Sequence, residues 1–222
     1  MLCLICSKSV SSQNHFTSLI LTHRKQDTIC PECWSQFERI ESPHCPHCCK
    51  AGISEICQDC QYWQNKGNLV DHQALFTYNQ AMKNYFSSYK FQGDYLLRKI
   101  FSSLIKNELK KYKDYTIVPI PLSDTSYHKR RFNQVIGFLD DGEIAYRNLL
   151  LVNKKDKAAQ SSKRKEERLK TKQFLKVRDQ QKLPSKILLV DDIYTTGATL
   201  ALARELLDEK GVKTIKTFSL AR

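Results

Sequence analysis

Apolar residues occur along this chain in two patterns, which are short continuous runs and longer stretches with helical spacing. The continuous runs lie at residues 116–122 (TIVPIPL), 187–190 (ILLV) and 215–220. Runs of this length are typical of strands in a parallel sheet, where both faces of each strand are buried. A shorter stretch at 74–78 alternates apolar and polar residues, which predicts a further short strand. Minor strands are expected near 146–152 and 174–177.

Helical spacing predicts the elements between these strands. After Asn79, a residue type that caps helices, four apolar residues share one helical face: Met82, Tyr85, Phe86 and Tyr89. A second helix is expected over 95–112, capped by Asp94, and further helices over 133–139 and 199–210. Alternation of strands and helices predicts an α/β fold with a parallel sheet.

Two acids and a turn of small residues follow the apolar run at 187–190. Asp191 and Asp192 should lie at the carboxyl end of that strand, where open α/β sheets bind ligands and where carboxylates can accept hydrogen bonds from sugar hydroxyls. The turn that follows contains small and hydroxyl-bearing residues: Thr195, Thr196, Gly197, Ala198 and Thr199. Its backbone N–H groups and the start of the next helix could hold a phosphate. The simpler alternative is an acidic turn that closes a buried strand.

Basic residues gather in two other places. The segment after 116–122 is basic and aromatic and contains Lys129, Arg130 and Arg131, which suit a pyrophosphate or a nucleic-acid backbone. The chain carries 36 Lys and Arg against 23 Asp and Glu, a net charge of +13, and much of the excess lies in residues 154–178. Its candidate nucleic-acid contacts are Lys163, Arg164, Lys165 and Arg168. A solvated charged loop is the alternative, but long loops inside ligand-binding domains commonly bind or cover ligands.

Eight of the nine cysteines form four Cys-x-x-Cys pairs: Cys3/Cys6, Cys30/Cys33, Cys45/Cys48 and Cys57/Cys60. Two such pairs supply the four thiolates of a closed tetrahedral site, so the sequence predicts two structural Zn²⁺ ions. Disulfides are the alternative, although regular spacing favours metal. Sequential pairing is simplest and a crossed arrangement is possible. Cys49, His44 and His47 could replace a ligand.

Length and composition complete the domain prediction. A chain of 222 residues fits a small module followed by a larger domain. We expect a cysteine-rich double zinc ribbon at 1–62, a polar linker at 63–73 and the α/β domain at 74–222. No secretory signal or apolar run long enough for a membrane helix is recognisable, so we expect a soluble, cytoplasmic protein without membrane insertion.

Residues 186–200 (KILLVDDIYTTGATL) resemble the ribose-phosphate signature of type I phosphoribosyltransferases, which bind 5-phosphoribosyl 1-pyrophosphate (PRPP) with Mg²⁺. Tyr194 stands where an aliphatic residue is commoner. The resemblance implies a parallel sheet with helices on both faces. It also implies that the catalytic acids Asp191 and Asp192 contact the ribose hydroxyls and, indirectly, Mg²⁺, and that residues 195–199 bind the 5-phosphate.

Essentially the whole chain resembles the ComF family of bacterial competence proteins. The shared features are the order of cysteine pairs, Pro-x-Pro-Leu at 119–122, Arg-x-Phe-Asn-Gln at 130–134, Gln160 followed by Glu167-Arg168, and VDDIYTTGAT. Residues 119–122, with Lys129 and Arg130, take the place of the pyrophosphate loop. This chain has Arg131 where the family usually has glycine. No base-binding hood is recognisable, because the cysteine module occupies the region where transferases of this class often build one.

The resemblance leaves two functions from different classes. In the first, a competence protein takes part in uptake of single-stranded DNA in the cytoplasm, beside a helicase-like ATPase partner, and keeps a PRPP-type site. In the second, the protein is an active Mg²⁺-dependent phosphoribosyltransferase that acts on a nucleobase or another nitrogen acceptor.

Overall fold

The computed structural model describes residues 1–10, 28–153, 173–179 and 182–222. The candidate nucleic-acid contacts Lys163, Arg164, Lys165 and Arg168 lie outside these ranges, as does Gln160. The strands are β1 (His72–Phe76), β2 (Thr116–Pro119), β3 (Leu150–Val152), β4 (Leu175–Val177), β5 (Lys186–Ile193) and β6 (Thr214–Ala221). The helices are α1 (Pro31–Trp34), α2 (Gln58–Asn65), α3 (Gln80–Ser87), the π-helix η2 (Ser88–Gln92), the 3₁₀-helix η3 (Tyr95–Leu97), α4 (Arg98–Leu109), the 3₁₀-helix η4 (Lys110–Tyr112), α5 (Asp124–Arg130), α6 (Gln134–Asp141) and α8 (Ala198–Glu209).

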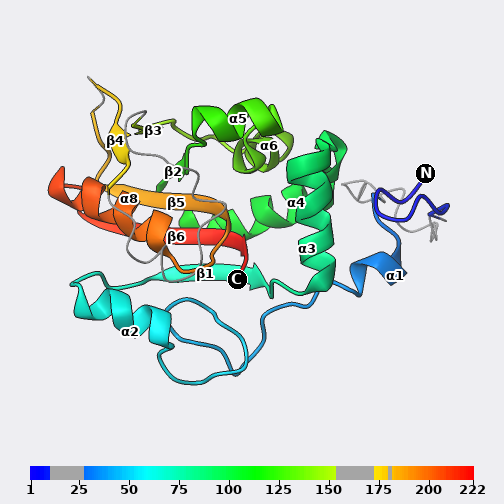
Figure 1. The fold of residues 1–222 in the computed structure, drawn as a ribbon, viewed down its shortest axis with the longest axis horizontal. Helices are drawn as coiled ribbons and strands as arrows, with labels where there is room; N and C mark the ends of the chain where they lie inside the picture. Colours follow the sequence, from blue (N-terminus) through cyan, green and yellow to red (C-terminus); the bar gives the residue numbers. More distant parts are fainter. Residues whose placement is uncertain (11–27, 154–172, 180–181) are drawn as a thin grey trace.

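Four strands form a parallel sheet in the order β1-β6-β5-β2, which confirms the predicted fold class (Figure 1). The last strand, β6, lies inside the sheet between β1 and β5. Strand β5 continues past the apolar run to Ile193, which pairs with Ala221, so Asp191 and Asp192 belong to the strand's final residues. The two carboxylates therefore point to opposite faces of the sheet, as successive side chains of a strand do.

Both faces of the sheet are covered, because successive residues of β5 enter different cores. Leu188 and Val190 pack in one core with residues of α3, α4 and α6. Ile187 and Leu189 pack in a second core with residues of α8 and the cysteines from Cys45 to Cys60. This double burial explains why the run at 187–190 shows no polar alternation. Within the described residues, no helix is long and apolar enough to cross a membrane.

The aromatic helix after β1 begins where the sequence predicts. The Asn79 side chain accepts a hydrogen bond from the Met82 N–H at 3.0 Å, which caps α3. The predicted face of Met82, Tyr85, Phe86 and Tyr89 is fully buried. Helix α3 then widens into η2, which ends at Gly93 with φ 75°. This π-helical segment separates α3 from the left-handed Gly93, and such segments are frequent at functional sites.

Strands β3 and β4 pair with each other, antiparallel, outside the main sheet, with Leu151 opposite Lys176. Both are three residues long, so the expected strand near 146–152 is shorter than predicted. They bracket the basic segment 154–172, which lies outside the described residues. The basic segment is thus inserted between two strands of a separate ribbon.

The N-terminal segment contributes directly to the larger core. Trp34 and Phe37 pack against Phe76 and Phe101, with ring centroids 5.1 to 6.3 Å apart. Backbone hydrogen bonds from Ile40 to Leu75 and from Thr77 to Glu38 follow the free edge of β1. The predicted linker, 63–73, includes the end of α2 and the start of β1.

His72 is a buried histidine at the beginning of β1. Its Nδ1 lies 2.9 Å from Thr217 Oγ1 and its Nε2 lies 2.9 Å from Ser219 Oγ, so a neutral ring can donate to one hydroxyl and accept from the other. Burial, and secondarily the charge of Arg222, lowers the pKa of His72 to about 3. Because the folded pKa lies below the unfolded value, the stability that His72 supplies is present above pH 6.5 and is lost as the pH falls towards 3.

We therefore expect the protein to lose about 2 kcal/mol of unfolding free energy between about pH 7.5 and pH 5 through His72 alone. The variant His72→Gln cannot bind this proton, so its unfolding free energy should fall by correspondingly less over the same pH interval. Urea unfolding of both proteins at the two pH values, with zinc in excess, measures the difference. Equal losses in the two proteins would show that His72 does not govern this pH dependence.

Candidate functional site

The eight paired cysteines form two groups of four, and the pairing is sequential. Cys3 and Cys6 join Cys30 and Cys33, and a second group joins Cys45, Cys48, Cys57 and Cys60; the sulfurs of each group lie within 4.8 Å of one another. The crossed arrangement that the sequence left open is not formed. All nine cysteines are free, so disulfides are not formed either.

The sulfur spacing fits a tetrahedral cation. Distances of 3.7 Å for Cys6 to Cys30, 3.9 Å for Cys45 to Cys60 and 3.5 Å for Cys48 to Cys57 compare with the roughly 3.8 Å between ligands of a Zn²⁺ held by four thiolates. Both groups could therefore hold zinc.

The other candidate ligands make different contacts. The Cys49 thiol donates to the His72 carbonyl at 3.3 Å, and Nδ1 of His44 and of His47 lies within 3.2 Å of a backbone carbonyl oxygen. Four thiolates without an open position are the ligand set of a structural zinc site. Substrate chemistry is therefore expected at the carboxyl ends of the sheet strands rather than on the cysteines themselves.

The two acids at the end of β5 point to opposite faces of the sheet. Asp192 is 9% exposed, on the face that carries α3, and its Oδ2 lies 2.6 Å from Nζ of Lys90 in η2. Asp191 lies on the α8 face, and its Oδ1 accepts a hydrogen bond from the Asp192 N–H at 2.8 Å. The carboxylates thus flank the strand end, one on each side, rather than forming a pair on one surface.

Lys90 is a site residue that sequence reasoning missed. It is 8% exposed, and its ammonium lies 4.7 Å from the centre of the Phe86 ring. A signal was present, because Met82, Phe86 and Lys90 are spaced four residues apart and therefore share the buried face of the helix. A lysine on an apolar helical face requires a buried partner, and that partner is Asp192.

The turn between β5 and α8 carries residues that the sequence suggested for a 5-phosphate, and we call residues 194–197 of it the phosphate loop. Gly197 precedes α8 with φ 77°, a left-handed conformation, and a side chain there would overlap the Tyr194 hydroxyl. Among the described residues, the N–H groups of Thr195, Thr196 and Gly197 have no acceptor. Three free donors beside a helix N-terminus form a concave site suited to an anion.

The side chains after Gly197 have structural roles of their own. Ala198 is the first residue of α8 and is buried, and its N–H reaches Thr196 Oγ1 at 3.5 Å. Thr199 is half-buried in the first turn of α8. The five residues predicted for the 5-phosphate are therefore divided between the turn, which holds Thr195, Thr196 and Gly197, and the first residues of α8.

The basic, aromatic segment at 127–134 contains the end of α5, a short non-helical connection at 131–133 and the first residue of α6. Ser123 caps α5, Arg131 ends it with φ 68°, and Asn133 caps α6. Lys129 is exposed, and Arg130 donates to Gln134 Oε1 at 3.1 Å. The cation on Asp192 is Lys90, whereas Lys129 and Arg130 belong to the end of α5.

Exposed aromatic rings surround this end of α5. Phe91 is 68% exposed and lies 5.7 Å from the Arg130 guanidinium, Tyr127 is 53% exposed, and Tyr95 is 39% exposed and contacts Phe132. We call this surface the basic-aromatic face; its members are Phe91, Tyr95, Tyr127, Lys129, Arg130 and Arg131. Interleaved rings and cations of this kind suit the bases and phosphates of a single-stranded nucleic acid.

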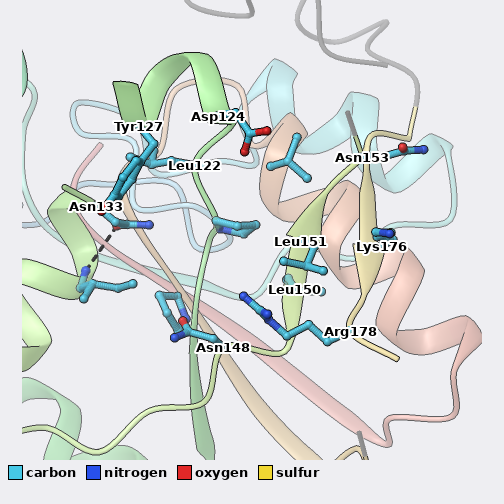
Figure 2. Close-up of a pocket in the computed structure, with 14 residues that line it drawn as sticks. Leu122, Asp124, Tyr127, Asn133, Asn148, Leu150, Leu151, Asn153, Lys176 and Arg178 are labelled. Carbon is cyan, nitrogen blue, oxygen red and sulfur yellow. Dashed lines mark hydrogen bonds between the residues drawn. The ribbon is translucent and has the colours of Figure 1, made fainter. Parts of the chain in front are cut away.

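A cavity of about 540 Å³ lies between α5 and the β3–β4 ribbon, beside the carboxyl end of β2 (Figure 2). Pro119, Pro121 and Leu122, the segment that the resemblance assigns to pyrophosphate, form part of its wall. Lys176 and Arg178 of the ribbon line the other side. Its size falls in the range of small-molecule sites, and its cations favour an anionic ligand.

Comparisons with known proteins agree with this architecture. The sequence model of the phosphoribosyl transferase domain matches residues 147–222. The chain is 48% identical over its full length to the whole of competence protein ComFC of Streptococcus pneumoniae. It is 31% identical to ComFC of Bacillus subtilis, covering all of this chain and 95% of that protein. It is 25% identical to competence protein F of Haemophilus influenzae, covering 90% of this chain and 93% of that protein.

The full-length identity and the geometry therefore lead to one assignment. A parallel sheet ends in two acids and a phosphate loop, two groups of four cysteines precede it, and relatives match from end to end. This chain belongs to the ComFC family of competence proteins.

Proposed function

We propose that this protein handles single-stranded DNA in the cytoplasm during natural transformation, and that it carries a PRPP-type ribose-phosphate site beside its DNA-binding face. The observation that carries the proposal is Arg131, a cation kept in a left-handed backbone conformation on the basic-aromatic face. A residue with a Cβ costs roughly 1 to 2 kcal/mol in this conformation, whereas glycine costs almost nothing. Backbone strain of this kind is typical of functional positions.

The basic-aromatic face offers both contacts that single strands need. Lys129 and Arg131 are exposed, and cations of this kind attract phosphates without regard to sequence. Phe91 and Tyr127 expose more than half of their surface, and exposed rings supply stacking platforms for bases. Tyr127 lies in the last turn of α5 and Arg131 directly follows the helix, so a ring and a charge are presented near its end.

Adjacent residues connect this face to the ribose-phosphate site. Lys90 points inward to Asp192, and Phe91, the next residue of η2, points outward with most of its ring exposed. A strand bound over Phe91 would therefore lie close to the carboxyl end of β5. The relatives of this chain are competence proteins, which supports a role in the uptake of that strand. A helicase-like ATPase would be the partner in this uptake.

A second candidate is Mg²⁺-dependent phosphoribosyl transfer, which the phosphate loop and the neighbouring cavity favour. Carboxylate oxygens suit Mg²⁺, and the metal, when bound with PRPP, would draw charge from the leaving pyrophosphate. An acceptor nitrogen would form a bond to C1 of the ribose as the bond from C1 to the pyrophosphate oxygen breaks. The chain's own residues would hold the 5-phosphate on the loop and the ribose hydroxyls on the acids.

The variant Arg131→Gly tests the DNA-binding face. It removes the strain and one phosphate contact, so we expect unfolding free energy to rise by about 1 kcal/mol while affinity for oligo-dT falls. The slope of log K against log salt should decrease by roughly 0.7 if one phosphate contact is lost. Fluorescence anisotropy at several salt concentrations, together with urea unfolding, measures both effects.

Two variants complete this experiment. Lys111→Ala removes an exposed cation from η4, before β2 and thus at the opposite end of the sheet, and should leave the salt slope unchanged. Phe91→Ala should weaken binding by about 1 to 3 kcal/mol without changing the slope. If Arg131→Gly and Lys111→Ala changed the affinity for oligo-dT and its salt slope equally, the basic-aromatic face would not be the DNA site.

Calorimetric titration of PRPP with Mg²⁺ tests the ribose-phosphate site. We expect micromolar binding, about 8 kcal/mol of affinity, and its loss in Asp191→Asn, which leaves the buried Lys90–Asp192 pair intact. Asp192→Asn is tested only together with Lys90→Met, because a lone buried charge destabilises the fold. Asp191→Asn and the double variant Lys90→Met/Asp192→Asn should both still bind oligo-dT. Absence of heat from the wild-type protein would exclude a PRPP site, and loss of DNA binding in Asp191→Asn would refute the separation of the two sites.

A further inference from the structure

We propose that Trp63 and Arg222 are positioning residues for the phosphate loop, and that they connect its geometry to the state of the second cysteine group. In this view, a cation held by Cys45, Cys48, Cys57 and Cys60 fixes the loop that receives a phosphate ester. The inference rests on the ribose-phosphate site proposed above, but the connection itself is built from contacts within this chain.

Trp63 supplies the first connection. It follows Cys60 by one helical turn in α2, and Cys57 is the N-cap of that helix. The indole Nε1–H donates to the Thr196 carbonyl at 2.7 Å, and the ring is buried against Ala198 and Ala201 of α8. The position of α2, which carries one cysteine ligand and follows another, thus determines where the loop carbonyl can lie.

Arg222 supplies the second connection. Its Nη1 donates to the Thr195 carbonyl at 2.7 Å, its Nε donates to Cys48 Sγ at 3.4 Å, and its Nη2 donates to Asp59 Oδ2 at 3.2 Å. The Arg222 and Asp59 side chains are 8% and 5% exposed. One planar guanidinium therefore joins the loop, a cysteine ligand and α2 in a fixed arrangement, which a lysine could not reproduce.

Tyr194 fills the space between these groups. The Arg222 guanidinium lies 4.8 Å from its ring centre, and His72 packs on the ring at 4.3 Å. Its hydroxyl is buried beside Gly197 and has no hydrogen-bond partner among the described residues. The loop therefore rests on a rigid aromatic support, and a displacement of Arg222 would be transmitted to it through this ring.

The chemistry of the connection favours a dependence on metal. The carbonyls of Thr195 and Thr196 are held on the side of the cysteines. Because a trans peptide directs its N–H opposite to its C=O, the N–H groups of Thr196 and Gly197 point away from the cysteines and could meet a phosphate. Arg222 donates to Cys48 Sγ, and a Zn²⁺ bound by the four sulfurs would hold this acceptor in a fixed position. Loss of the cation would thus weaken the contact that fixes Arg222.

The first cysteine group provides an internal control. Its buried members are Cys3, Cys30 and Cys33, and the apolar residues packed against them are Cys6, Val10 and Ile29. None of these residues belongs to the phosphate loop or to α2. Equivalent changes in the two groups should therefore affect the loop differently.

Hydrogen exchange of the full-length, zinc-loaded protein tests the proposal. We expect Arg222→Ala to speed exchange of the Tyr194 and Ala201 amides, which donate to Ala221 and to Gly197 of the loop, by at least about tenfold. It should also weaken PRPP binding about 10- to 100-fold. Millimolar guanidinium should partly reverse both effects in Arg222→Ala, slowing exchange and strengthening PRPP binding. A variant whose fold is merely destabilised would not respond to guanidinium in this way. Arg222→Lys keeps the positive charge but lacks the planar guanidinium. We therefore expect its loop exchange to be faster, and its PRPP binding weaker, than in the wild type.

A second measurement uses Trp63 as a reporter. In a Trp34→Phe background, Trp63 is the sole tryptophan, so removal of metal should change its emission if α2 moves. Cys48→Ser should reproduce the change in emission and in loop exchange, whereas Cys6→Ser should leave both near wild type. If circular dichroism showed that a cysteine variant had lost secondary structure, the guanidinium rescue of Arg222→Ala would decide the question.

The outcomes separate this inference from the proposed function. If the wild type binds PRPP and Arg222→Ala binds it equally well, with unchanged loop exchange, the positioning role is wrong and the PRPP site stands. If the wild type binds no PRPP while loop exchange still follows Arg222 and Cys48, the connection stands and the proposed ligand is wrong. Equal responses to Cys48→Ser and Cys6→Ser would refute the dependence on the second group.

Discussion

The alternation of side chains along β5 is the constraint on which the rest of the structure depends. Neighbouring residues of a strand face opposite sides of the sheet, so Asp191 and Asp192 leave the end of β5 on different sides. Each acid instead belongs to a different layer. Asp192 meets Lys90 of η2, and Asp191 lies on the side where α8 and the second cysteine group cover the sheet.

This division gives the strand end two distinct surroundings. On one side, η2 connects the buried Lys90–Asp192 pair to Phe91 and the cations at the end of α5. On the other side, the phosphate loop is held from behind by Trp63 and Arg222. A phosphorylated sugar at the carboxyl edge would contact both sides at once, so one small ligand could influence the basic-aromatic face and the phosphate loop together.

The sequence was sufficient where local chemistry decides the structure. Apolar runs, the Asn79 cap and the Cys-x-x-Cys spacing each follow from a residue and its near neighbours, and these predictions are confirmed. It was insufficient where residues distant in the chain meet. Nothing near Arg222 indicates Cys48, Asp59 and Thr195, and nothing near Lys90 indicates Asp192. Lys90 could have been suspected from its place on an apolar face, but its partner comes from a strand much later in the chain.

The buried pair also argues that this edge of the sheet is kept for a ligand rather than for stability. Replacing a buried ion pair by packed apolar side chains is often neutral or stabilising, so Lys90 and Asp192 are not explained by folding alone. Widening of the helix at Ser88–Gln92 brings the Lys90 ammonium to within 2.6 Å of the carboxylate and turns Phe91 to solvent. An arrangement that fixes one carboxylate at a strand end and exposes a ring beside it serves recognition, because both features face the place where the ribose and the nucleic acid would meet.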